Sequence, residues 1–182
     1  INHVFLSKHD QKNFFDLFFR KFLSATMVRK VMDRSAILRN GVDIEFIDKT
    51  VGNIDWKRGR SAGSFYRLDE NKGTKDVLAL YQNLSILGKL DRVVVTWAHP
   101  GKLEDGLPAT NPTVPSGWEF YPESDRASWM KKASTVAAGI FNSHSESSPV
   151  CPVEAAAVGC VPILPNRPWV QDMIPGWELV YN

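Results

Sequence analysis

The chain has 182 residues, 43% of them hydrophobic and 23% charged, with a formal net charge of +2. These values are ordinary for a globular domain with a real core, and so small a charge gives no support for nucleic acid as a partner. No apolar run approaches the roughly 20 residues of a membrane-spanning helix, and no signal peptide is recognisable, which predicts a cytoplasmic protein. The two cysteines, Cys151 and Cys160, flank one predicted helix and are expected to be buried thiols rather than zinc ligands.

The first 63 residues predict a strand, an amphipathic helix and a loop-rich connection. Residues 3–7 form a short apolar run, and residues 8–23 have helical spacing of apolar residues. Core packing is the favoured interpretation of this apolar stripe, and attachment to a membrane surface or a partner is the alternative. Asn40-Gly41 predicts a turn, and residues 52–63 predict a solvated loop with basic residues. The stripe and the basic cluster consist of Phe14, Phe15, Phe18, Phe19 and Phe22, and of Lys57, Arg58 and Arg60.

Strands and helices alternate through the rest of the chain. The expected strands are residues 64–68, 92–97, 118–121, 136–141, 161–164 and 178–181. The expected helices are residues 74–87, 124–133 with Ser124 as its cap, a short Ala-rich segment ended by Gly159, and residues 168–174. Residues 102–116 predict a long irregular connection. This alternation predicts an α/β fold, a Rossmann-like doubly wound parallel sheet with helices on both faces.

Residues 142–164 combine a strand end, a Ser-rich loop, a short helix and a new strand, which is typical of a βαβ unit. Ligands of such units lie beyond the carboxyl ends of the strands. Glu146 in the loop and Glu154 in the first helical turn would both lie on that side. Two carboxylates suggest acid/base chemistry, a metal or hydroxyl recognition. Because the loop offers no further acids or histidine pairs, hydroxyl recognition is favoured.

A second constellation follows the strand expected at residues 64–68. Arg67 and Lys72 stand between that strand and the next helix, so both can project into the same end of the sheet. Two cations in that position suit a phosphate or diphosphate. Gly73 permits close approach at the helix start, where backbone amides and the helix dipole also favour anions.

Four motifs in order resemble the C-terminal, donor-binding half of a GT-B glycosyltransferase of the retaining family-4 (group 1) type. The match covers about residues 36–182 and differs from the family pattern at Tyr66, which replaces a glycine, and at Ser147-Ser148-Pro149, where Phe-Gly is usual. The motifs are Asn40-Gly41-Val42-Asp43, Arg67-Leu68 with Lys72-Gly73, the Glu-x7-Glu pair Glu146 and Glu154, and the stretch Ile174-Pro175-Gly176-Trp177.

The resemblance implies transfer of a sugar from a nucleotide-diphosphate sugar, such as a UDP- or GDP-sugar, to an acceptor with retention of configuration. It implies no metal and no other cofactor. Arg67 and Lys72 would hold the diphosphate, Glu146 would contact the transferred sugar, and Glu154 would bind the ribose. Catalytic roles are thus expected for Arg67, Lys72 and Glu146. The expected donor-binding residues are Arg67, Lys72, His99, Gly101, Phe120, Tyr121, Ser147, Ser148, Val150 and Glu154.

By the same resemblance, residues 1–40 would be a remnant of the N-terminal acceptor domain and its linker, and residues 41–182 the nucleotide-sugar-binding domain, truncated at its C-terminal end. The isolated piece is expected to be inactive. Its partners would be the missing domain and an acceptor that is a polysaccharide, a lipid, a small molecule or a modified DNA base. Peripheral contact with the inner membrane is a further option. Two alternatives stay open: a non-catalytic nucleotide- or glycan-binding module, and a sugar-nucleotide epimerase.

Overall fold

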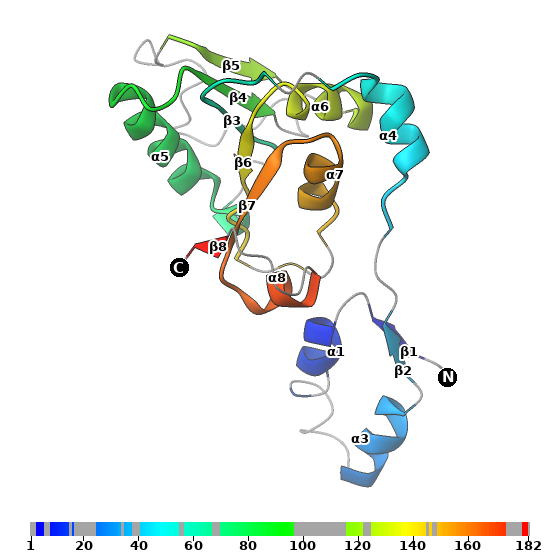
Figure 1. The fold of residues 1–182 in the computed structure, drawn as a ribbon. Helices are drawn as coiled ribbons and strands as arrows, with labels where there is room; N and C mark the ends of the chain where they lie inside the picture. Colours follow the sequence, from blue (N-terminus) through cyan, green and yellow to red (C-terminus); the bar gives the residue numbers. More distant parts are fainter. Residues whose placement is uncertain are drawn as a thin grey trace.

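A parallel sheet of six strands forms the centre of the chain in this computed structural model (Figure 1). The structure describes residues 3–5, 8–14, 16, 25–33, 35–37, 41–54, 57–66, 70–96, 116–121, 125–144, 146, 149–173 and 180–181. The strand order is β5-β4-β3-β6-β7-β8, and every recorded pairing is parallel. The strands are β3 (Ser61–Ser64), β4 (Arg92–Thr96), β5 (Trp118–Tyr121), β6 (Ala138–Ile140), β7 (Val161–Pro165) and β8 (Val180–Tyr181).

Helices cover both faces of this sheet, which confirms the predicted doubly wound α/β fold. One face carries α5, and α4, α6 and α7 pack together on the other (Figure 1). Strand β4 lies between the two layers: Val93 and Val95 pack in the α5 cluster, Val94 packs in the opposite cluster, and all three are fully buried. Burial on both faces explains the uninterrupted valine run. The helical elements are α4 (Ile44–Val51), η2 (Glu70–Lys72), α5 (Thr74–Ile86), α6 (Arg126–Ala133), α7 (Cys151–Ala157) and α8 (Pro168–Met173).

The N-terminal segment has a small sheet of its own. Two parallel strands pair from His3↔Ser35 to Phe5↔Ile37, and this segment lies beside α8 rather than within the main sheet (Figure 1). Of the phenylalanine stripe, only Phe14 belongs to the described residues. No helix in the described part of the chain is both long and apolar enough to cross a bilayer. The elements are β1 (His3–Phe5), α1 (Lys8–Phe14), α3 (Ala25–Met32) and β2 (Ser35–Ile37).

Strand β3 lies three residues earlier than predicted, because its sequence Ser-Ala-Gly-Ser is a poor strand signal. Its small residues are required by packing instead. A Cβ at Gly63 would lie 2.0 Å from Cζ of Phe65, whose ring covers the strand. All four residues of β3 are buried. The strand at the centre of the sheet is therefore defined by its neighbours rather than by local propensity.

Two other expectations were wrong, and a third element was missed. Helix α6 is capped by Asp125, which accepts from the amides of Ala127 and Ser128, and not by Ser124. The basic residues of the predicted solvated loop have structural partners: Arg58 donates to the carbonyls of Val136 (3.1 Å) and Val158 (2.9 Å).

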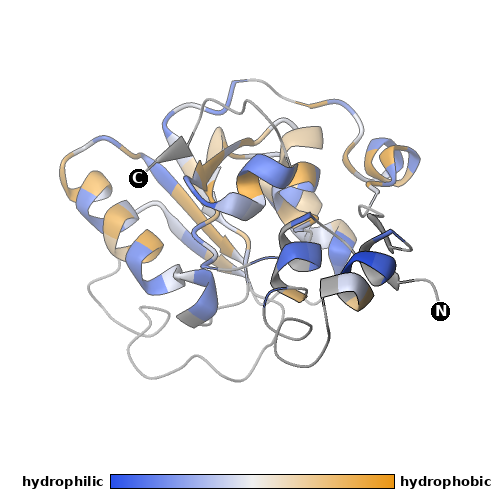
Figure 2. Ribbon diagram, turned by 90° about the horizontal axis from the view of Figure 1, so that it is seen from below, coloured by the Kyte–Doolittle hydropathy of each residue, from blue (hydrophilic) through white to orange (hydrophobic). Residues whose placement is uncertain are grey.

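Helix α4 was not predicted. Its signal was the cap Asp43, whose Oδ1 accepts from the amide of Phe46 at 2.9 Å. On the outer side, Lys49 pairs with Glu45 four residues earlier. In Figure 2 the helices carry both hydrophilic and hydrophobic residues, as amphipathic layers over a sheet should.

An ion pair at the sheet edge predicts acid sensitivity. Arg92 donates to Glu119 at 2.5 Å and 3.1 Å, Tyr121 adds a bond of 2.6 Å, and together they lower the pKa of Glu119 from 4.5 to about 2. The ionised carboxylate therefore stabilises the fold above about pH 4.5, and this stabilisation is lost as the pH falls towards 2.

Glu119→Gln should lower the free energy of unfolding by about 1–2 kcal/mol at neutral pH, allowing for partial solvent screening. The difference between mutant and wild type should shrink steadily below about pH 4.5. Urea titrations between neutral and acidic pH measure it. A difference that stays constant across that range would contradict this assignment.

Candidate functional site

The order of the sheet places a switch point between β3 and β6. From β3 the chain proceeds outward through β4 and β5, and from β6 it proceeds in the opposite direction through β7 and β8. The loops that leave the carboxyl ends of β3 and β6 therefore diverge and leave a crevice, where ligands of open α/β sheets bind. Both predicted constellations follow these two strands: Lys72 lies beyond β3, and Glu146 lies beyond β6.

The two loops are bound to each other by their backbones. The amide of His144 donates to the carbonyl of Asn71 at 2.8 Å, and the hydroxyl of Ser143 donates to the same oxygen at 3.4 Å. The residue after Lys72, Gly73, has φ +58° and lies against Asn142. These contacts fix Lys72 beside the residues that lead to Glu146.

Lys72 and Glu146 form an ion pair across the crevice, between Nζ and Oε1. Each side chain is 14% exposed, so the pair is shielded from solvent without being sealed. The ammonium also lies 4.9 Å from the centre of the Tyr66 ring. The sequence prediction that these two residues share one site is consistent with this contact, although the contact does not test their roles.

Glu154 lies one helix further on and has a different partner. It sits in α7 with its side chain 4% exposed, and its Oε1 accepts from Nε of Arg126 at 2.6 Å and from Nη2 of the same residue. Burial raises the pKa of the Glu154 carboxyl, and the hydrogen bond and charge of Arg126 act in the opposite direction. Arg126, from the first turn of α6, also lies over the ring of Phe46, 5.0 Å from its centre.

Cys151 connects these charges. Desolvation raises the pKa of its thiol to about 11, Glu154 and Glu146 raise it further by their charge, and Lys72 lowers it. A buried thiol that feels all three groups lies between them. Lys72, Glu146 and Glu154 therefore surround one region at the start of α7, and the expectation that Cys151 is an unreactive buried thiol agrees with its raised pKa.

The remaining predicted residues fall into three groups. Val150 is the N-cap of α7, and its carbonyl accepts from the amide of Glu154 at 2.9 Å. Phe120 and Tyr121 end the edge strand β5, where Phe120 stacks on Trp118 and Tyr121 lies under Lys132. Their predicted contact with the donor base stays a prediction. The third group lies outside the described residues: Arg67, His99, Gly101, Ser147 and Ser148.

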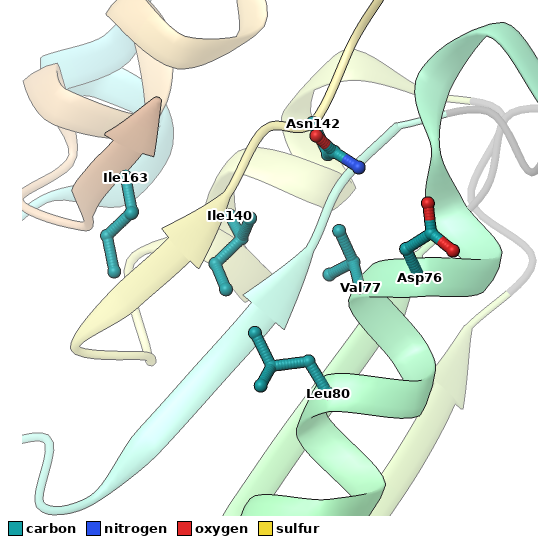
Figure 3. Close-up of a pocket in the computed structure, with 6 residues that line it drawn as sticks. All are labelled: Asp76, Val77, Leu80, Ile140, Asn142 and Ile163. Carbon is teal, nitrogen blue, oxygen red and sulfur yellow. The ribbon is translucent and has the colours of Figure 1, made fainter. Parts of the chain in front are cut away.

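A pocket of about 300 Å³ adjoins the crevice on the α5 face of the sheet (Figure 3). Val77, Leu80, Ile140 and Ile163 form its apolar walls, and Asn142 and Asp76 lie at its rim. Apolar walls do not suit a diphosphate, so the charged crevice is the better candidate for a phosphate-bearing ligand. Across the described ranges, no cluster of three or more His, Cys, Asp or Glu side chains could hold a metal ion; metal-independent chemistry stays a prediction.

Sequence reasoning missed Arg126 and the backbone bonds between the loops. Arg126 is 28 residues from Glu154 and belongs to no motif, although its place in the first turn of a helix after a strand was a usable signal. The third strand of this edge also contributes: Arg167, after β7, contacts Nδ1 of His144 at 3.1 Å, and Trp169 donates to the carbonyl of Ser143.

A six-stranded sheet of this order, with its charged crevice at the switch point, is the Rossmann-like fold found in glycosyltransferases of the GT-B type. No family model matches the sequence, and no curated protein matches it. Solved structures do. An α,α-trehalose-phosphate synthase (UDP-forming) from Burkholderia vietnamiensis has a TM-score of 0.69 and 15% identity, over 98% of this chain and 48% of that one.

Two further similar structures contain ligands. The E. coli trehalose-6-phosphate structure bound with UDP-2-fluoro glucose has a TM-score of 0.60 and 16% identity, over 82% of this chain and 41% of that one. The catalytic domain of starch synthase IV from Arabidopsis thaliana, bound to ADP and acarbose, has a TM-score of 0.60 and 13% identity, over 98% and 42%. At these identities the likeness establishes the fold. The chain spans less than half the length of these proteins.

Proposed function

We propose that this chain supplies the nucleotide-sugar site of a retaining glycosyltransferase of the family-4 type. The observation that carries the proposal is the Lys72–Glu146 pair, which joins the two loops at the switch point of the sheet. Similar structures described with UDP-2-fluoro glucose and with ADP support a nucleotide-bearing donor. Residues 41–182 would carry this donor site, and residues 1–40, with their separate two-stranded sheet, would belong to an acceptor domain.

The chemistry of the pair suits a departing nucleoside diphosphate. Transfer of the sugar leaves negative charge on the diphosphate, and a fixed ammonium beside it stabilises that charge as it develops. Lys72 would fill this role together with Arg67. Glu146 would accept hydrogen bonds from hydroxyls of the sugar, and Glu154 from hydroxyls of the ribose. No step in this scheme needs a metal ion.

Donor binding would exchange one partner of each group. Without donor, Lys72 and Glu146 neutralise each other at 14% exposure. A diphosphate replaces the carboxylate at Lys72, and a sugar hydroxyl replaces the ammonium at Glu146. Since each charged group keeps a polar partner throughout, no buried charge is left uncompensated.

Lys72→Met tests the proposal. Calorimetric titration with UDP-glucose, ADP-glucose and GDP-mannose should show binding of at least one donor to the wild type. Lys72→Met should weaken it by on the order of 1.5–3 kcal/mol, or about ten- to a hundredfold, because a charge-assisted bond is lost. Lys75→Met is the matched control, since Lys75 is an exposed lysine three residues along the chain. Equal affinities for Lys72→Met and Lys75→Met, or no heat with any donor, would refute the proposal.

One feature favours a non-catalytic binding module as the second candidate. Pro149, which is buried at the loop before α7, has no amide to donate to a phosphate. In that case donor would bind without turnover. Assays of sugar release from UDP-glucose, on a chain that contains both domains, separate the two functions. The acceptor, the cytoplasmic location and contact with the inner membrane stay predictions.

A further inference from the structure

We propose that Arg126 is a positioning residue for the donor site: it holds the Glu154 carboxylate in one orientation and keeps it charged, so that the second carboxylate oxygen can receive a ligand hydroxyl. This inference rests on the proposed function for the identity of the ligand. Its structural basis, the Arg126–Glu154 contact, does not.

Both guanidinium bonds fall on the same oxygen. Nε of Arg126 donates to Oε1 of Glu154 at 2.6 Å, and Nη2 donates to Oε1 as well. Among the described residues, no hydrogen bond reaches Oε2 of Glu154. Arg126 therefore uses one carboxylate oxygen and leaves the other available, which is the arrangement that an acceptor of ligand hydroxyls needs.

The surroundings of Arg126 prevent it from following any other partner. Its guanidinium lies over the Phe46 ring at 5.0 Å, on the side of α4 that packs against α6 and α7. Glu154 is confined in turn, because its side chain is 4% exposed and α7 is held by the amide of Glu154 on the carbonyl of Val150. A stacked guanidinium and a buried carboxylate have few other rotamers, so the contact fixes the direction of the carboxylate.

The charge of Glu154 also depends on this contact. Burial by itself favours the neutral acid, and Arg126 is the charged group that opposes it. Of the titratable groups on the elements around α7, the described structure shows only Arg126 hydrogen-bonded to Glu154. Those groups are Asp125, Arg126, Lys131 and Lys132 on α6, Glu45, Asp48 and Lys49 on α4, Cys151 on α7 itself, and Lys72 and Glu146 on the two loops.

Arg126→Met keeps the apolar stem and removes the charge, which makes donor binding pH-dependent. With UDP-glucose, whose diphosphate does not titrate in this range, wild-type affinity should stay nearly constant between roughly pH 5.5 and 8. Arg126→Met should bind within about threefold of wild type at the upper end and at least about tenfold more weakly at the lower end, because a neutral Glu154 is a poorer acceptor. Arg126→Lys should restore most of the flat profile. Arg60→Met, which removes a comparable but exposed arginine–aspartate pair, is the control.

A measurement without ligand separates this inference from the proposed function. In carbon-13 carboxyl NMR, with Glu154→Gln to assign the signal, the titration midpoint of Glu154 should move upward by about one pH unit or more in Arg126→Met. An unmoved midpoint, or a flat affinity profile in Arg126→Met with normal wild-type binding, overturns the role of Arg126 and leaves the donor site intact. If the midpoint moves and no nucleotide sugar binds to the wild type, the donor site fails and the electrostatic coupling alone survives.

Discussion

Gly73→Ala should lower the free energy of unfolding by about 2–4 kcal/mol and weaken UDP-glucose binding at least about tenfold. Gly73 has φ +58°, a conformation that costs an L-residue about 1 kcal/mol or more. Its Cβ would also lie 2.8 Å from the main-chain oxygen of Asn142 and 2.4 Å from the side-chain nitrogen. Since a backbone atom cannot rotate away, the loops after β3 and β6 would have to separate.

That separation would act directly on the proposed site. Lys72 precedes Gly73, and Asn142 leads to the loop that carries Glu146, so any shift changes the distance across the crevice. Gly88→Ala is the matched control, because Gly88 has φ +64° and nothing within 4 Å of its Cβ. It should lose only the backbone contribution, about 1 kcal/mol, with donor affinity unchanged. Urea unfolding and calorimetry measure both variants; equal losses of stability would show that the contact with Asn142 is unimportant.

The fold was predictable because its signals are local. The valine run at β4, the helical spacing of Val77, Leu78 and Tyr81 in α5, and the strand–loop–helix pattern before Glu154 all follow from periodicity within a few residues. Strand β3 failed the same test, because Ser-Ala-Gly-Ser has no strand propensity and owes its place to the Phe65 ring over Gly63.

The candidate site divides in the same way. The expectation that Lys72 and Glu146 share an edge of the sheet follows from topology, since both residues come directly after parallel strands. The partner of Glu154 could not be predicted, because Arg126 reaches it through the packing of α6 on α7 across 28 positions. Arg58 is a similar case: its two carbonyl partners are 78 and 100 residues away, so a local interpretation as a solvated cation was wrong. Side chains that work through tertiary contacts leave no local pattern.

The second large effect is expected at Tyr81, which lies under the switch point. Its hydroxyl donates to the carbonyl of Gly63 in β3 at 2.7 Å and accepts from the amide of Ile140 in β6 at 3.0 Å. The recorded pairing of these strands is limited to Ala62↔Ala138 and Gly63↔Gly139. The hydroxyl therefore replaces direct pairing where β3 and β6 begin to diverge, and it satisfies backbone groups that the opening of the crevice would otherwise leave buried and unbonded.

Tyr81→Ala should lower the free energy of unfolding by about 4–5 kcal/mol, since it removes a ring that is 1% exposed and both hydrogen bonds at once. Leu80→Ala, at a 44% exposed position of the same helix, should cost under about 1 kcal/mol. Because the alanine variant could unfold, Tyr81→Phe isolates the hydroxyl: it should cost about 1–2 kcal/mol and speed hydrogen exchange at the Ile140 amide. If that amide stays as protected in Tyr81→Phe as in the wild type, β3 and β6 have closed onto each other. The crevice would then narrow at its base, and UDP-glucose affinity would fall although the core is intact.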